Sequence, residues 1–355
     1  MSLTQDRLEQ VRMVRDSVAA VAPAGGDLRR IRALRFTTPG FDRETWKIMC
    51  DMGWPGLRVS EEDGGAGFGV SESSAVAEEL GKALVPEPLL AAAFAARLLS
   101  GAALERQLSG EQLVLPAWQE RAGAIEPGEA TQWHDGTVSG RKMFIPMASG
   151  ADAFVVVLAD GLALVQADAP GVTLRCDATQ DGGHYGTLTL DGAKAERIAA
   201  PPGAVAEALD EATLATAAML LGVMERAFEL SLDYLRTRKQ FGKPIGSFQS
   251  LQHRSADLKI QVALTRASVE AAAASLDAGV DARVRQAVVS RAKARAADAA
   301  MRITREAIQL HGGIGYTDEA DVGLYLRKAM VLANQHGTAA AHRLRYAEMM
   351  PEEES

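Results

Sequence analysis

The sequence predicts a mainly helical α+β protein with a helical N-terminal domain, a small barrel-like β domain and a C-terminal four-helix bundle. Apolar residues first recur at helical spacing, then give way to short β-branched runs, and finally return to helical spacing in long segments. The length of 355 residues also exceeds that of a usual single-core domain. We place the three domains at residues 1–112, 113–204 and 205–355.

The first region is predicted to be helical throughout. Its first helix begins near Asp6 and is marked by an apolar stripe that consists of Leu8, Val11, Val14, Val18 and Val21. A second helix is expected over 43–52, closed by Gly53, and a third over 71–84, after a glycine-rich loop at 61–67. An Ala/Leu run over 89–99 predicts a further helix.

The middle region carries β-prone runs at residues 154–158, 162–165 and 186–190. Turn residues bound another short segment at 136–140, and Pro201-Pro202-Gly203 ends the sheet. This pattern predicts a small β domain and no parallel βαβ sheet.

The C-terminal region is predicted to form four long helices, over 207–237, 248–278, 282–310 and 320–349. Their many alanines permit close approach between helices. Because the alanine-rich faces of 248–278 and 282–310 are poor in charge, we expect them to pack into a subunit interface.

Composition excludes several classes of protein. The net charge of -8 disfavours a nucleic-acid binder, because phosphates would be repelled. Cys50 and Cys176 form no metal-binding spacing and are too few for a disulfide framework, so we expect no metal site and a reducing, cytoplasmic location. The longest strictly apolar run, 89–96, is too short to span a membrane, and residues 1–21 carry acids where a signal peptide needs an apolar core.

Two segments carry residues suited to a flat, anionic ligand. In 238–245, Arg238 offers a forked donor to phosphate and Phe241 offers a ring face, just before a Gly/Pro turn. In 309–316, three glycines follow a helix end that carries Gln309 and His311, so a ligand could contact the backbone. Each segment alone is also compatible with an ordinary glycine-capped helix end.

Together these segments resemble the acyl-CoA dehydrogenase family, in order and spacing over nearly the whole chain. The similarity extends to the loop at 61–67 and to Glu78-Glu79-Leu80-Gly81. The C-terminal residues that carry it are Tyr234, Arg238, Gln240, Phe241, Gly242, Pro244, Ile245, Phe248, Gln249, Gln252, His253, Ala256, Asp257, Leu258 and 309–316.

The resemblance implies an FAD-dependent enzyme that removes an α-proton and a β-hydride from an acyl-CoA, with a bundle that forms tetramers. It assigns five residues to the adenosine and pyrophosphate end of FAD, largely that of a neighbouring subunit: Arg238, Phe241, Gln249, Gln309 and Gly313. Thr338 is assigned to the cofactor as well.

The sequence departs from the family on the flavin side. Where members commonly read Thr-Glu-Pro and Ala-Gly-Ser-Asp, this chain has Gln119 and Ala124 in a segment one residue shorter. Where they read Trp-Ile-Thr, it has Phe144-Ile145-Pro146. The hydroxyl groups expected near the flavin ring are therefore missing.

The catalytic base also differs. His336 stands where most members carry the catalytic Glu, and Ala212 stands where a second branch carries it, one residue after Glu211. An imidazole can accept a proton near neutral pH, so His336 is a candidate base, and it can equally be a non-catalytic replacement. Glu211 would point about 100° away from the family's position on the helix.

Two hypotheses follow from these observations. The chain is either an acyl-CoA dehydrogenase that works as a homotetramer with His336 as an unusual base, or a non-catalytic subunit. In the second case it would complete the FAD site of a catalytic paralogue in a heterotetramer, as in the branch of the family that degrades steroid side chains. A nucleic-acid binder derived from the family ranks last because of the net negative charge.

Overall fold

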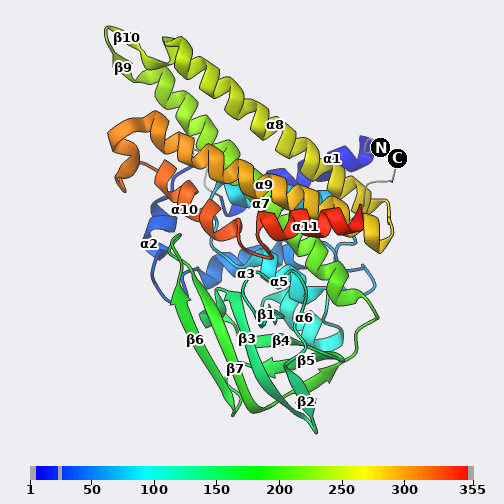
Figure 1. Cartoon of the computed structure of the whole chain (residues 1–355). Helices are drawn as coiled ribbons and strands as arrows, with labels where there is room; N and C mark the ends of the chain where they lie inside the picture. Colours follow the sequence, from blue (N-terminus) through cyan, green and yellow to red (C-terminus); the bar gives the residue numbers. More distant parts are fainter. Residues whose placement is uncertain (1–4, 23–25, 351–355) are drawn as a thin grey trace. The chain divides into compact units, whose positions relative to one another are not determined.

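The computed structural model describes residues 5–22 and 26–350 and confirms the mainly helical α+β fold (Figure 1). The chain divides into two compact units, each assembled from segments distant in sequence. Unit 1 comprises Met1–Val18, Ser74–Leu84 and Thr213–Ser355, and unit 2 comprises Ala19–Ser73 and Val85–Ala212.

The helices of unit 2 are short. They are α2 (Arg29–Leu34), α3 (Arg43–Asp51), α5 (Leu89–Ala96) and α6 (Gly101–Ser109). Helix α3 begins where predicted, because the Asp42 side chain accepts a hydrogen bond from the Glu44 amide and caps it. The expected helix over 89–99 ends earlier, at Ala96.

The strands of unit 2 form two separate four-stranded sheets, so the middle region is not a closed barrel. One sheet has the order β1 (Val114–Ala117), β4 (Ala153–Leu158), β5 (Gly161–Gln166) and β8 (Glu196–Ile198). The other has the order β2 (Gln132–His134), β3 (Thr137–Pro146), β7 (His184–Lys194) and β6 (Val172–Ala178). The pairing of β1 with β4 is parallel, yet strands β2 and β3 rather than a helix connect them. The first sheet packs against α5, and Phe94 of α5 lies in one buried apolar cluster with Val155 and Leu164.

Unit 1 is a helical bundle. Helix α1 (Gln5–Ser17) and the end of α4 (Val70–Lys82) join α8 (Gln249–Asp277), α9 (Ala282–His311) and most of α7 (Ala204–Thr237). Glycines allow α4 and α7 to approach closely: a Cβ on Gly81 would lie 2.2 Å from the Met219 carbonyl oxygen, and one on Gly222 would lie 1.8 Å from that of Glu78.

The helix predicted over 320–349 is in fact two helices, α10 (Val322–Leu332) and α11 (Ala339–Met349). The chain turns between them because His336 and Gly337 have left-handed backbone angles, with φ of 58° and 107°. Thr338 then caps α11 by accepting a hydrogen bond from the Ala341 amide. The break therefore lies at His336, the candidate base of the sequence analysis.

The two alanine-rich helices differ in what covers them. Alanines of α9, among them Ala292, Ala296 and Ala300, are already buried within the single chain, so their face needs no partner subunit. Helix α8 instead presents an apolar stripe at helical spacing that is exposed in the single chain. The stripe consists of Ala256, Ile260, Ala263, Leu264, Ala267 and Ala271.

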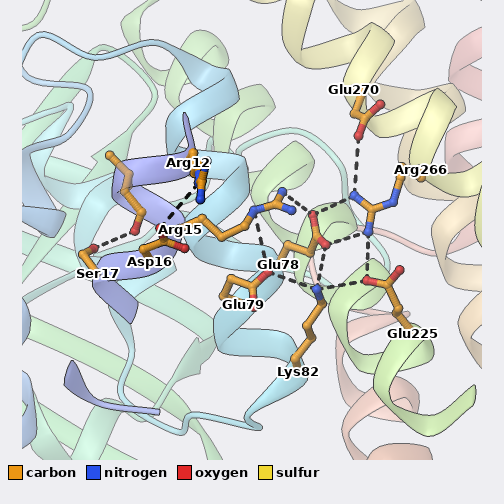
Figure 2. Close-up of polar contacts among 11 residues, drawn as sticks. Arg12, Arg15, Asp16, Ser17, Glu78, Glu79, Lys82, Glu225, Arg266 and Glu270 are labelled. Atoms are coloured by element: carbon orange, nitrogen blue, oxygen red, sulfur yellow. Dashed lines mark hydrogen bonds and ion pairs between the residues drawn. The ribbon is translucent and has the colours of Figure 1, made fainter. Parts of the chain in front are cut away.

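A buried ion cluster ties four helices of unit 1 together (Figure 2). The carboxylate of Glu78 on α4 accepts hydrogen bonds from both terminal nitrogens of Arg266 on α8, at 2.7 and 3.2 Å. It also accepts one from Arg15 on α1, at 3.0 Å. Lys82 lies 3.3 Å from Glu78 and 3.1 Å from Glu225 of α7. Burial opposes ionisation of Glu78, but the bond from Arg266 and the three nearby cations outweigh it and lower the pKa of this carboxyl.

Candidate functional site

A tight hairpin connects α7 to α8 at one end of the bundle (Figure 1). Strands β9 (Lys239–Gln240) and β10 (Lys243–Pro244) pair across Phe241 and Gly242, whose φ angles of 52° and 80° are those of a primed hairpin turn. A phenylalanine rarely adopts such angles. The turn presents the ring outward, with 89% of its surface exposed, and the ring forms a T-shaped pair with that of Phe248, at 6.1 Å between centroids.

The end of α9 lies beside the end of α7, where the rings of His311 and Tyr234 stack with their centroids 4.4 Å apart. The chain leaves α9 through Gly312, whose φ of 63° favours glycine. Gly313 differs: a Cβ there would meet no atom of the described residues within 4 Å. Packing within this chain therefore does not require a glycine at 313, whereas close approach by an external group would.

The structure brings five of the sequence-predicted site residues to this end of the bundle. All five are exposed, and they are Arg238, Phe241, Gln249, Gln309 and Gly313. Among the residues that the structure describes, none forms a side-chain hydrogen bond or ion pair with Arg238, Gln249 or Gln309. A guanidinium, an aromatic ring, two amides and a bare backbone are the groups that bind phosphates and a heteroaromatic base, so the set fits the nucleotide half of FAD.

Thr338 does not belong to this set. It lies in the turn between α10 and α11 together with His336, and its hydroxyl oxygen caps α11, 3.2 Å from the Ala341 amide nitrogen. On α9, this turn is contacted by Lys293, which precedes Gln309 by 16 residues, or about 24 Å of helix. The bundle of one chain therefore carries two separate groups of candidate residues.

His336 is buried, and its Nδ1 lies 3.2 Å from the hydroxyl oxygen of Thr216. Its carbonyl oxygen lies 2.9 Å from Nε2 of His342. A carbonyl oxygen only accepts, so Nε2 of His342 carries the hydrogen and its Nδ1 is free to accept from the hydroxyl of Ser290, at 3.2 Å. Burial, with the positive charges of Lys293 and Arg345, lowers the pKa of His342 to about 3 and keeps it neutral.

Lys293 is a site residue that sequence reasoning missed. Its side chain is fully buried, and its Nζ donates to the carbonyl oxygens of Ala333 and Gly337, both at 3.0 Å. Burial lowers the pKa of Lys293 to about 7. The available signal was periodicity: Lys293 falls on the same helical face as Ser290 and Ala297, within a run of small buried residues.

The loop of unit 2 that carries Gln119 and Ala124, where the sequence departs from the family pattern, is hydrogen-bonded to itself. The Gln119 side chain donates to the carbonyl oxygens of Arg121 and Ala124, at 3.0 and 3.4 Å. Glu120 accepts from buried Lys142 and from Thr131, both at 2.7 Å. Although burial opposes its ionisation, these bonds and one from the Ala130 amide lower the pKa of Glu120 to about 2.

Phe144 lies at an irregularity of β3, where the register with β7 shifts between Lys142 and Ile145. Its φ is 59°, and its ring meets the edge of Tyr185 at 5.9 Å between centroids. Pro146, the last residue of β3, pairs with Tyr185 in the ladder and has no hydroxyl. The side chain at position 119 is thus an amide already hydrogen-bonded to its own loop, the one at 124 is a methyl group, and the one at 146 is a proline ring.

Glu211, the alternative base, serves an ion pair within unit 2. Its two oxygens lie 2.9 Å from Arg58 and 3.2 Å from Arg97. The neighbouring Ala212 is buried and carries no group that can accept a proton. Both observations leave His336 as the more suitable proton acceptor.

Two negative findings apply to the described ranges 5–22 and 26–350. No cluster of three or more His, Cys, Asp or Glu side chains could hold a metal ion. No helix there has the length and apolar character that crossing a bilayer requires.

Comparison with known proteins identifies the family. The family model "Acyl-CoA dehydrogenase, N-terminal domain" matches residues 8–112, and "Acyl-CoA dehydrogenase, C-terminal domain" matches residues 203–350. The chain is 33% identical to acyl-CoA dehydrogenase IpdE2 of Mycolicibacterium smegmatis, over 93% of this chain and 94% of that protein. It is 34% identical to acyl-CoA dehydrogenase FadE27 of Mycobacterium tuberculosis, over 81% and 83% of the two chains.

Solved structures agree. A chain of the ChsE4-ChsE5 complex from Mycobacterium tuberculosis superposes with a TM-score of 0.86 and 30% identity, covering 100% of this chain and 99% of that one. A variant of the Tcur3481-Tcur3483 steroid ACAD gives a TM-score of 0.87 and 27% identity, covering 97% and 98%. The chain therefore belongs to the acyl-CoA dehydrogenase family, as its motifs predicted.

Proposed function

We propose that this chain is a subunit of an FAD-dependent dehydrogenase that removes an α-proton and a β-hydride from an acyl-CoA thioester. When bound, FAD supplies the acceptor for the hydride. The chain's own contributions are to bind the nucleotide half of a cofactor at the end of its bundle and to hold a candidate proton acceptor in the turn at His336. Family membership and the separation of these two groups support the proposal.

The proposed role of the bundle end is to bind the adenosine and pyrophosphate of a neighbouring subunit's FAD. The observation that carries this role is that the guanidinium of Arg238 has no hydrogen-bond or ion-pair partner among the described residues, while the ring of Phe241, three residues on, is 89% exposed. Exposing an aromatic ring and leaving a guanidinium unpaired stabilises nothing within the chain itself. Both side chains gain partners when a phosphate and an adenine ring lie against them.

We further propose that the neighbouring subunit is a catalytic paralogue. The ChsE4-ChsE5 and Tcur3481-Tcur3483 relatives are each named as pairs of chains, and the second is named a steroid ACAD. The exposed stripe on α8 offers an apolar face for such a partner. Gln119, which is bonded to its own loop, and Pro146, which lacks a hydroxyl, are poorly suited to contact a flavin. The substrate class would then be a steroid-derived acyl-CoA.

A second candidate is a homotetramer in which His336 is the base. It is favoured by the buried, hydrogen-bonded position of the imidazole beside Thr216. Neutral imidazole accepts a proton readily at working pH. The two candidates share the bundle-end FAD contact and differ in which chain carries out the chemistry.

Arg238→Ala is expected to weaken flavin retention by about 10- to 100-fold, because hydrogen bonds to a charged group contribute about 1.5–3 kcal/mol. The flavin-to-protein absorbance ratio after gel filtration of the assembled protein measures the loss. Arg236→Ala is the matched control, since Arg236 lies on the same helix end but pairs with Asp233 at 3.2 Å. Unchanged flavin in Arg238→Ala, or equal loss in both variants, would remove the bundle end from the cofactor site.

A further inference from the structure

Two buried side chains form hydrogen bonds to the backbone of the turn that carries His336, and we call this set of hydrogen bonds the grip. Lys293 of α9 binds the carbonyl oxygens of Ala333 and Gly337, and His342 of α11 binds the carbonyl oxygen of His336 itself. Three carbonyl groups within five residues are therefore satisfied by side chains from two helices. Such carbonyl groups would otherwise be buried without partners, which is unfavourable.

The grip coincides with an unfavourable backbone conformation. His336 has a φ of 58°, in the left-handed region that residues with a Cβ seldom occupy. A residue stays in such a conformation only when its surroundings hold it there. The two bonds of Lys293 attach to the residues before and after the Asn334–His336 stretch, so the lysine fixes both ends of the turn.

Neither side chain depends on a titration to form these bonds. Both the ammonium and the neutral amine of Lys293 carry enough hydrogens for two carbonyl groups. His342 donates from Nε2 as a neutral imidazole, and Ser290 fixes that tautomer through Nδ1. No carboxylate among the described residues pairs with Lys293, so its hydrogen bonds are directed at the turn and not at another charge.

We propose that Lys293 and His342 are positioning residues that hold the His336 turn in its left-handed conformation and thereby keep the imidazole beside Thr216. The value of this position for dehydrogenation rests on the proposed function, whereas the grip on the turn does not. Without the grip, the turn would relax toward ordinary backbone angles, and the imidazole of His336 would leave its site.

Hydrogen exchange of the intact, assembled protein, measured by mass spectrometry, tests the grip directly. In Lys293→Met and His342→Leu, the peptide covering 331–338 is expected to exchange at least about tenfold faster, because the local turn opens more often. His342→Gln keeps an N–H donor at a similar reach and is expected to restore slow exchange. Lys142→Met, which removes a buried lysine of unit 2, is the matched control and leaves this peptide unchanged.

Two results would overturn the proposal: unchanged exchange at 331–338 in both Lys293→Met and His342→Leu, or faster exchange spread equally over α9 and the rest of unit 1. The second pattern would mean that the residues support the bundle as a whole. Turnover is measured on the same samples. A loosened turn with a lowered kcat and an unchanged KM supports the positioning role in catalysis, whereas a loosened turn with full turnover upholds the grip and contradicts a catalytic His336.

Discussion

His336→Ala is expected to lower the rate at which this chain dehydrogenates an acyl-CoA by a factor of about 10²–10⁴, if the chain supplies its own base. The imidazole is the proton acceptor that remains in the family's position, since Ala212 carries no such group and Glu211 is held between two arginines. Flavin content is expected to stay unchanged, because the bundle-end residues lie far along α9 from this turn. Stopped-flow reduction of the flavin by substrate measures the effect.

His134→Ala is the control for this experiment. His134 lies on β2 with its side chain 89% exposed, and its Nε2 lies 3.5 Å from a carboxylate oxygen of Asp135. A rate that is the same in His336→Ala as in the unmodified protein would exclude His336 from the chemistry. The proton acceptor would then be another group, either Glu211 or a residue of a partner chain.

Glu78→Ala is expected to lower the free energy of unfolding by about 3–5 kcal/mol, because it removes the least exposed carboxylate of the cluster and leaves Arg15, Lys82 and Arg266 with fewer acidic partners. The side chain of Glu78 is 5% exposed and contacts Arg15, Lys82 and Arg266 (Figure 2). Chemical denaturation at pH 7 of the two proteins measures the difference.

Glu270→Ala provides the matched control. Glu270 pairs with the same Arg266, at 3.4 Å, but its side chain is 64% exposed, so its removal is expected to cost less than about 1 kcal/mol. The pKa of Glu78 is lowered in the folded chain, so its contribution is present above the unfolded pKa and is lost as the pH falls through the lower, folded pKa. Equal destabilisation by the two substitutions would contradict this account of the cluster. So would a difference in unfolding free energy between the two variants that grows as the pH falls.

Sequence patterns predicted the elements best where one signal dominated. The change from helical to β spacing and back correctly predicted the order of helical and β regions. The expectation of a barrel-like middle domain was wrong in its closure, because closure depends on pairing between strands distant in sequence. Nor did the spacing predict the break at His336, although Gly337 followed by the capping Thr338 is a local signal for one.

Burial was harder to predict than helicity. The alanines of α8 and α9 look alike in sequence, yet those of α9 pack within the chain and many of those on α8 remain exposed. Periodicity identifies an apolar face but not what covers it. The same reason explains why Lys293 was overlooked, since its role depends on carbonyl groups 40 and 44 residues away in sequence.

The bundle-end residues were predicted from motifs, and the structure adds their exposure. Among the described residues, no side-chain contact accounts for the guanidinium at 238, and no packing constraint requires a glycine at 313. A sequence alone does not reveal either fact. The roles of these residues as FAD contacts stay a prediction. The central claim is therefore that this end of the bundle completes a neighbouring subunit's cofactor site.

The measurement that tests this claim most directly is the number of flavins per subunit after co-expression with a paralogue that carries the catalytic Glu. We expect a complex with two copies of each chain, fewer flavins than subunits, and loss of flavin on Arg238→Ala although the catalytic chain is untouched. Full flavin occupancy and dehydrogenation of an acyl-CoA by this chain expressed alone would contradict the partner-subunit role.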